Sequence, residues 1–138
     1  MSTAAAFDSL LPDPQLTPGL VARKPTERRG VTEAMRMKVY KRYRISPERR
    51  AKYVIDHLIP KELGGADAVK NLWPQKIDAH PYNAARKEFL TGRFLKMIAA
   101  GEMTLAQAQQ EMREDWISAF VIHVGMVHLT PRTLSVED

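Results

Sequence analysis

The sequence predicts an α+β fold that is mostly helical, with a short two-stranded hairpin and further helices after it. Three observations predict this class. A run of β-branched and aromatic residues over 53–59 is typical of a strand. A turn-rich stretch with a glycine pair separates that run from a second short strand at 72–73. Apolar residues recur at helical spacing over 31–44, over 83–100 and again from 104 onward.

The N-terminal 30 residues are predicted to form an extended arm rather than part of the domain. Prolines and a glycine over 11–19 are turn and extended-chain signals, and apolar residues are sparse. We expect this arm to lie over the domain or to be partly mobile. The folded domain then covers residues 31–120, and residues 121–138 form a C-terminal tail.

The first helix, over 31–44, has one apolar stripe and one basic surface. The stripe repeats every four residues, at Val31, Met35, Val39 and Tyr43. The basic side chains fall mostly on other faces and include Arg36 and Lys41. Such a surface either lies against a DNA backbone or is an ordinary solvated face, and both interpretations stay open.

The strand over 53–59 should end near Pro60, because proline is a poor continuation of a central strand. Gly64 and Gly65 then mark a turn that needs a positive φ or a close approach of two backbone segments. One helical turn over 66–70 precedes the second strand, in which Trp73 is expected to lie in the core.

Two helices are predicted after the hairpin. The first, over 83–100, has a buried stripe at Leu90, Phe94, Met97 and Ile98 and a plausible stop at Gly101. The second begins at Thr104, with Gln107 as a capping-box partner. The apolar segment 121–129 can extend this helix, add a strand or dock on a partner.

Composition limits the chemistry that the protein can perform. The formal net charge of +5 and the pI near 9.6 suit a polyanionic partner. There is no cysteine, which excludes disulfides, thiolate zinc sites and cysteine nucleophiles. Any metal must therefore bind to oxygen and nitrogen ligands.

The sequence contains no segment that predicts membrane insertion. No apolar run approaches the roughly 20 residues of a membrane span. The N-terminus lacks the basic and apolar regions of a signal peptide. We expect a cytoplasmic protein that does not contact membranes, with export by a route that needs no such signal as the alternative.

An acid and a histidine at the end of the first strand suggest phosphodiester hydrolysis. This reaction needs a base to activate water and a cation to neutralise charge on the phosphate. His57 is suited to act as the base, and Asp56 is a hard oxygen ligand for magnesium or manganese. Neighbouring strand residues point to opposite faces, so both serve one site only if the strand ends or bends there.

Other residues of the predicted site come from the rest of this stretch. A helix that opens near Asn83 would present its amide oxygen as a second metal ligand, and Lys87 one turn later could reach a phosphate. Arg86 and Lys87 stay open between a solvated face and contact with DNA. Asn71 is suited to an internal role, in which it ties the loop and fixes the backbone of the base.

At these residues three ordered motifs produce a specific resemblance. They are DHLIPKELGG at 56–65, NLWP at 71–74 and NAARK at 83–87. Together they resemble the HNH endonucleases of the ββα-metal (His-Me finger) fold, in particular a bacterial and phage subgroup with DHLIPxELGG, NLWP and NAxxK motifs. The segment GEMTLAQAQ at 101–109 and the DW pair at 115–116 also resemble its C-terminal helices. The resemblance covers residues 31–120.

The resemblance implies a role for each matching position. Asp56 corresponds to the metal ligand, His57 to the general base and Asn71 to the asparagine that braces the loop. Asn83 stands where the third letter of HNH is a histidine, and this departure favours Mg²⁺ or Mn²⁺ over zinc. His80 is the alternative ligand if the helix starts earlier. One metal would polarise the scissile phosphate and stabilise the leaving oxygen.

Three functions follow from these observations. The first is a metal-dependent endonuclease that nicks or cleaves DNA, with double-stranded DNA as its partner. The second is a nucleic-acid-binding module of the same fold that cleaves poorly. The third is a toxin or effector nuclease controlled by a protein partner or inhibitor, with segment 121–129 or the arm as the docking surface.

Overall fold

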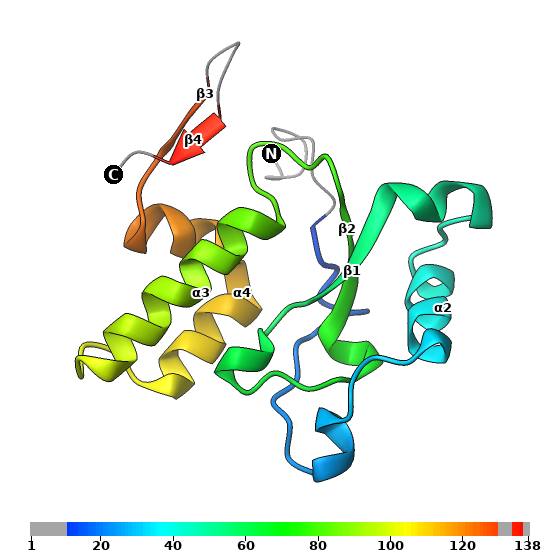
Figure 1. The fold of residues 1–138 in the computed structure, drawn as a ribbon, viewed down its shortest axis with the longest axis horizontal. Helices are drawn as coiled ribbons and strands as arrows, with labels where there is room; N and C mark the ends of the chain where they lie inside the picture. Colours follow the sequence, from blue (N-terminus) through cyan, green and yellow to red (C-terminus); the bar gives the residue numbers. More distant parts are fainter. Residues whose placement is uncertain (1–10, 130–133, 137–138) are drawn as a thin grey trace.

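The computed structural model describes residues 11–129 and 134–136 and has a mixed α+β fold. An antiparallel hairpin of β1 (Tyr53–His57) and β2 (Leu72–Lys76) lies between two helical parts, as Figure 1 shows. The helix α2 (Glu33–Arg42) lies on one side, and α3 (Ala84–Ala99) and α4 (Leu105–His123) lie on the other. Short 3₁₀ helices connect these elements: η1 (Pro25–Arg28), η2 (Pro47–Lys52), η3 (Lys61–Leu63) and η4 (Val69–Asn71).

The hairpin differs from the prediction at both strands. Strand β1 ends at His57, because the next two residues of the apolar run, Leu58 and Ile59, turn into the core, where they are fully buried. Strand β2 is longer than expected and contains Pro74, which faces Ile55 in the register. A proline fits here because both strands of a two-stranded sheet are edge strands.

The glycine pair in the loop serves both purposes that the sequence suggested. Gly64 adopts a left-handed conformation with φ of 88° and ends η3. Gly65 has no room for a side chain, because a Cβ atom there would lie 1.6 Å from the carbonyl oxygen of Ile59. The loop therefore folds back tightly on the end of β1.

The two helices after the hairpin pack on each other and on the hairpin loop. Their buried residues, among them Leu90, Phe94, Met112 and Phe120, join Trp73 in one core cluster. Thr104 and Gln107 form the predicted capping box. Helix α4 is kinked at Asp115, whose carboxylate accepts hydrogen bonds from the backbone N–H and hydroxyl of Ser118.

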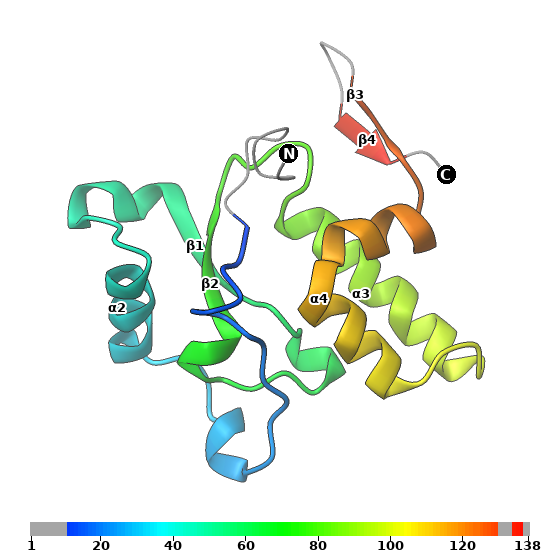
Figure 2. The same cartoon turned by 180° about the vertical axis from the view of Figure 1, so that it is seen from behind.

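The end of the chain takes two of the forms left open for segment 121–129. Helix α4 continues to His123, and β3 (Val127–Leu129) follows it. This strand pairs with β4 (Leu134–Val136) in a second, separate hairpin. Figure 2 shows this hairpin standing away from α3 and α4. Within the described ranges, no helix is long and apolar enough to cross a bilayer.

Residues 11–30 of the predicted arm lie on the domain. Their backbone bonds to the glycine loop: Ala22 N–H donates to Gly64 O at 2.8 Å, and the carbonyl of Leu20 accepts from Ala66 N–H at 2.9 Å. Gly19 N–H donates to Lys70 O at 3.0 Å. Of the two alternatives for the arm, contact with the domain is confirmed for this part, and residues 1–10 lie outside the described residues.

Candidate active site

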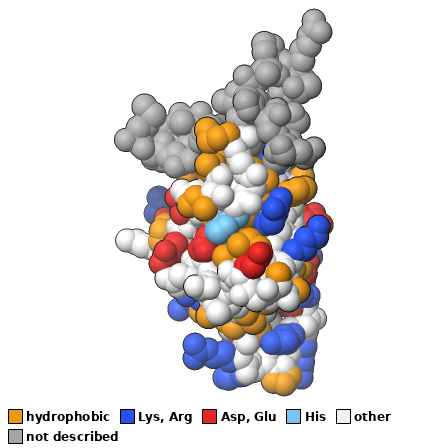
Figure 3. Space-filling model, turned by 90° about the vertical axis from the view of Figure 1, so that its left-hand side faces the viewer, with side chains coloured by type: hydrophobic (Ala, Val, Ile, Leu, Met, Phe, Trp, Pro, Cys, Tyr) orange, Lys and Arg blue, Asp and Glu red, His pale blue; other side chains and the backbone are white. Residues whose placement is uncertain are grey.

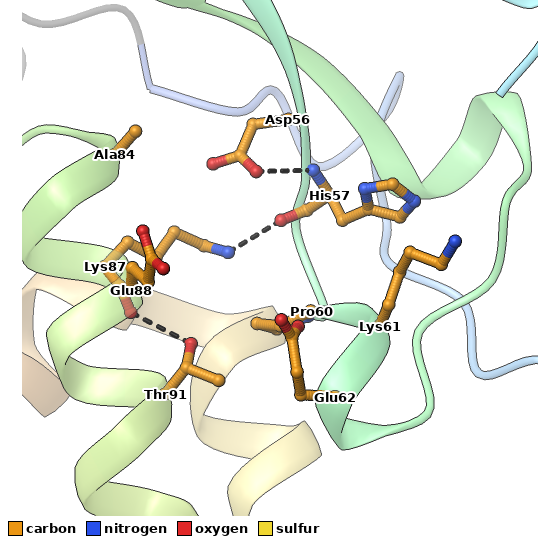
Figure 4. Close-up of a pocket in the computed structure, with 9 residues that line it drawn as sticks. All are labelled: Asp56, His57, Pro60, Lys61, Glu62, Ala84, Lys87, Glu88 and Thr91. Carbon is orange, nitrogen blue, oxygen red and sulfur yellow. Dashed lines mark hydrogen bonds between the residues drawn. The ribbon is translucent and has the colours of Figure 1, made fainter. Parts of the chain in front are cut away.

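The end of β1 opens into a cavity of about 320 Å³ between the glycine loop and α3. Figure 4 shows that side chains from three segments line it. They are Asp56 and His57 from the strand, Pro60, Lys61 and Glu62 from the loop, and Ala84, Lys87, Glu88 and Thr91 from α3. Asp56 and His57 therefore line the same cavity, and β1 ends at this point, as the sequence analysis required for a shared site.

Asp56 and His57 nevertheless point to opposite sides of β1. Figure 4 shows the Asp56 carboxylate on the α3 side and the His57 ring on the side of Lys61. The carboxylate is held in place because its Oδ1 accepts from His57 N–H at 2.8 Å and its Oδ2 accepts from Gln75 Nε2 at 2.9 Å. The two side chains face the cavity from different directions rather than lying side by side.

The His57 imidazole has a partner that the sequence argument missed. Its Nε2 lies 2.8 Å from Oδ1 of Asp67, whose side chain is 1% exposed. The other oxygen of Asp67 accepts from Gly30 N–H at 2.6 Å and lies 3.6 Å from Lys61 Nζ. Burial acts to raise the pKa of Asp67, but hydrogen bonds from His57 and Gly30 outweigh it and leave the pKa below its usual value.

Asn71 uses its whole side chain to brace the loop. Its Oδ1 accepts from Ile59 N–H at 3.0 Å and from Leu20 N–H at 3.2 Å. Its Nδ2 donates to the carbonyls of Ile59 and Ala66, both at 3.0 Å. The side chain is fully buried and is not part of the cavity lining, so Asn71 holds the loop and the arm from within the domain.

Asn83 and His80 do not line the cavity. Asn83 is the N-cap of α3, where its Oδ1 accepts from Arg86 N–H at 3.0 Å. This bond uses one of the two lone pairs of the amide oxygen and leaves the other for a ligand. The adjacent Ala84 is part of the lining, whereas His80 is exposed on the segment before the helix. The choice between these two ligands stays a prediction.

The donor atoms around the cavity suit a hard cation. Asp56, Glu62 and Glu88 are carboxylates in the lining, and carboxylate oxygens are ligands that such cations prefer. In the part of the chain that the structure describes, no group of three or more His, Asp or Glu side chains is placed to hold a metal. Magnesium or manganese would fit here with few protein ligands and several waters.

Lys87 and Arg86 are both buried, which excludes the solvated face, one of the two alternatives left open for them. Lys87 is 3% exposed, and its Nζ donates to the carbonyl of His57 at 2.6 Å and lies 5.5 Å from the ring centre of Trp73. Burial lowers the pKa of Lys87 to about 8. Arg86 is 6% exposed, and its Nε donates to Pro81 O at 2.8 Å. Of the two, only Lys87 lines the cavity, where a phosphate contact stays a prediction.

A sequence signal for Asp67 and Gln75 was available only in part. Asp67 follows the glycine loop, where an aspartate is usually a solvated turn residue. What sets Asp67 apart is the near-complete burial of its side chain beside His57, and no local sequence pattern predicts this burial. Gln75 could be found only once the register of β2 was known, because its partner Asp56 lies diagonally across the hairpin.

Basic side chains concentrate on the side of the molecule that carries η1, α2 and η2. Twelve of the 21 lysines and arginines lie between Arg23 and Lys52, with three of the 16 acidic residues. Arg36 and Lys41 are exposed on α2. The opposite side, over α3 and α4, mixes acidic, basic and hydrophobic side chains, as Figure 3 shows.

The chain was also compared with known proteins. No protein-family model, curated protein or solved structure matches it. The residues and geometry of the cavity, together with the basic surface, are therefore what indicates a function for this chain.

Proposed function

We propose that this protein is a metal-dependent HNH endonuclease that hydrolyses phosphodiester bonds of DNA. One observation carries the proposal: His57, which is hydrogen-bonded to the buried carboxylate of Asp67, lines the same cavity as Asp56. The carboxylate of Asp56 is itself held by Gln75 at the end of the hairpin strand. The order of β1, β2 and α3 along the chain supports a ββα-metal core. The three motifs that resemble the family fall on these elements and on the loop between the strands.

The proposed roles follow from chemistry and position. His57 accepts a proton from the attacking water, since an imidazole is effective near neutral pH. Asp56 and Asn83, with His80 as the alternative to Asn83, would hold Mg²⁺ or Mn²⁺. A bound cation supplies charge stabilisation at the phosphate and at the leaving oxygen. Gln75 and Asn71 keep the strand end and its loop in place for this chemistry.

Double-stranded DNA is the proposed substrate because the molecule offers a basic surface for a polyanion. The exposed side chains of Arg36 and Lys41 lie on α2, within the stretch that holds most of the positive charge. Contacts of this kind bind backbone phosphates and carry no sequence information directly. The proposed enzyme therefore has limited sequence preference.

A second candidate is the same nuclease under the control of a protein partner. Two large hydrophobic side chains are exposed at the end of α4 and just after it: Ile122 is 74% exposed and Met126 is 63% exposed. This feature favours docking at the C-terminal end, as expected for a toxin or effector held by an inhibitor. A catalytically weak DNA-binding module would use the basic surface alone.

Nicking of supercoiled plasmid tests the proposal. The protein should relax the plasmid with Mg²⁺ or Mn²⁺ and lose this activity with a chelator. His57→Ala should reduce the rate by about 10²–10⁴-fold because the base is removed. Binding of the same DNA, measured by gel shift, should survive in this variant.

Two further variants sharpen the test. Asn83→Ser keeps an oxygen for the helix cap but shortens the ligand, so it should weaken Mn²⁺ binding measured by calorimetry. His80→Ala should leave Mn²⁺ binding unchanged. The reverse pattern would make His80 the ligand, and full activity of His57→Ala would remove the assignment of the base.

A further inference from the structure

The contact between Asp67 and His57 bears on which nitrogen of the imidazole ring carries the proton, as well as on the position of the ring. Asp67 is anchored at its backbone and at one carboxylate oxygen: its backbone N–H donates to Glu27 O at 2.8 Å, and its Oδ2 accepts from Gly30 N–H at 2.6 Å. Its Oδ1 is thereby directed at Nε2 of His57. The arm before α2 supplies both anchors, so the carboxylate is fixed by chain segments that lie far from His57 in sequence.

An ionised carboxylate can only accept hydrogen bonds. Gly30 N–H donates to Oδ2 of Asp67, and the ammonium of Lys61 lies 3.6 Å from the same oxygen; both favour the ionised form. The bond at 2.8 Å therefore requires a proton on Nε2 of His57. In a neutral imidazole with a proton on Nε2, the lone pair is on Nδ1.

We propose that Asp67 is a positioning residue that holds His57 in the Nε2–H tautomer and makes Nδ1 the atom that accepts the proton from water. This inference rests on the proposed nuclease function for its catalytic half. Its structural half, the tautomer, holds whether or not the protein cleaves DNA. The carboxylate also stabilises the imidazolium that forms when Nδ1 is protonated.

Asp67→Asn tests the proposal with little change in shape. The amide oxygen can still accept from Gly30 N–H, which leaves the amide nitrogen facing His57. An amide nitrogen donates, so it needs a lone pair on Nε2 and moves the ring proton to Nδ1. The active tautomer is then lost, and the nicking rate should fall by about 10²–10⁴-fold with little change in KM.

The tautomer is measured directly by ¹⁵N NMR of the full-length, metal-free protein with labelled histidine. The parent should show a proton on Nε2 that exchanges slowly with water, and Asp67→Asn should show the proton on Nδ1. Asp78→Asn, the same change at an exposed aspartate, should alter neither the tautomer nor the rate. If Asp67→Asn does not fold, the slowly exchanging Nε2 proton of the parent remains the test.

Two results would overturn the inference. One is a parent protein with the ring proton on Nδ1, or with no protected proton on Nε2. The other is an Asp67→Asn variant that folds, keeps the Nε2–H tautomer and cleaves at the parental rate. A third result separates the two proposals. If the ring proton moves from Nε2 in the parent to Nδ1 in Asp67→Asn but the parent cleaves no DNA, the positioning role is supported and the proposed function is refuted.

Discussion

Asp56 and His57 are adjacent in sequence but have separate environments, because neighbouring residues of a strand point to opposite faces. Asp56 and His57 leave β1 on opposite sides, so the first is held by Gln75 and the second by Asp67. Each side chain is thus fixed by its own partner before any ligand binds. This arrangement is suited to catalysis because groups that are already oriented lose little entropy in the reaction.

The burial of Lys87 should make the stability of the protein depend on pH. Its folded-state pKa, about 8, lies below its ordinary value of 10.5, so the unfolded chain binds more protons between these values. The free energy of unfolding should therefore rise with pH over this window, by roughly 3 kcal/mol from this group. Chemical denaturation at pH 7.5 to 10.5, of the parent and of Lys87→Met, measures this contribution.

The comparison between the two proteins isolates the lysine from other groups that titrate in the same range. The variant lacks the ammonium, so its stability should rise less with pH than that of the parent. Parallel curves for the two proteins would show that Lys87 keeps an ordinary pKa when folded and that its burial has little energetic effect.

At the scale of an element, the loop between β1 and β2 is the part that assembles the site. It presents Asp67 to the histidine, places Lys61 and Glu62 in the cavity lining and is braced throughout by Asn71. The arm over residues 11–30 bonds to the same loop. The loop is therefore held from two sides, although it contains only short 3₁₀ turns of its own.

Gly65→Ala should strongly destabilise this loop. The new Cβ would lie 1.6 Å from a backbone oxygen, so the loop must move. We expect a loss of about 3 kcal/mol or more in the free energy of unfolding, together with loss of nicking. Thermal and chemical denaturation measure the first, and the plasmid assay measures the second.

Gly92→Ala is the matched control for this change. Gly92 lies within α3, and a Cβ atom there meets no other atom within 4 Å. The substitution should stabilise the protein by about 0.5–1 kcal/mol, because alanine favours a helix over glycine. Equal effects of the two substitutions would show that the close approach at Gly65 is not what shapes the loop.

Across the whole molecule, charge is distributed unevenly. The stretch from Arg23 to Lys52 holds twelve of the 21 basic residues, and it forms the side of the fold that carries η1, α2 and η2. The net charge of +5 therefore understates the local positive charge. Such an uneven distribution attracts a polyanion to one side of the molecule and orients it there.

Salt dependence of DNA binding tests this distribution. Replacing Arg36 and Lys41 by alanine should reduce the slope of log K against log salt by about 2, since each phosphate contact contributes close to one unit. Affinity is measured by fluorescence anisotropy at several salt concentrations. The double change at Arg93 and Lys96, which are exposed on α3, removes the same charge from the other side and should leave the slope unaltered.

An equal reduction of the slope by both pairs would mean that DNA responds to total charge rather than to the surface of α2. No reduction by either pair would remove these side chains as phosphate contacts. In both cases the residues of the cavity would remain candidates for catalysis, because their assignment does not depend on this surface.

Local patterns were sufficient to predict the mixed α+β class, the helices α2, α3 and α4 and the hairpin of β1 and β2, but not the pairing of β3 with β4. The helical periods, the capping box at Thr104 and Gln107, and the two uses of the glycine pair at Gly64 and Gly65 follow from interactions within a few residues of one another. The place of the arm was left open, and the lengths of both strands were wrong. These features depend on packing against distant segments, which periodicity does not encode.

Three-dimensional packing decided the environment of the site. Three contacts define this environment, and each joins residues 10 to 30 positions apart in the sequence. They are the hydrogen bonds of His57 with Asp67, of buried Lys87 with the carbonyl of His57, and of Gln75 with Asp56. A sequence shows which side chains can ionise or coordinate. Whether they do so depends on exclusion of water and on the direction of neighbouring donors, and both arise only when the chain has folded.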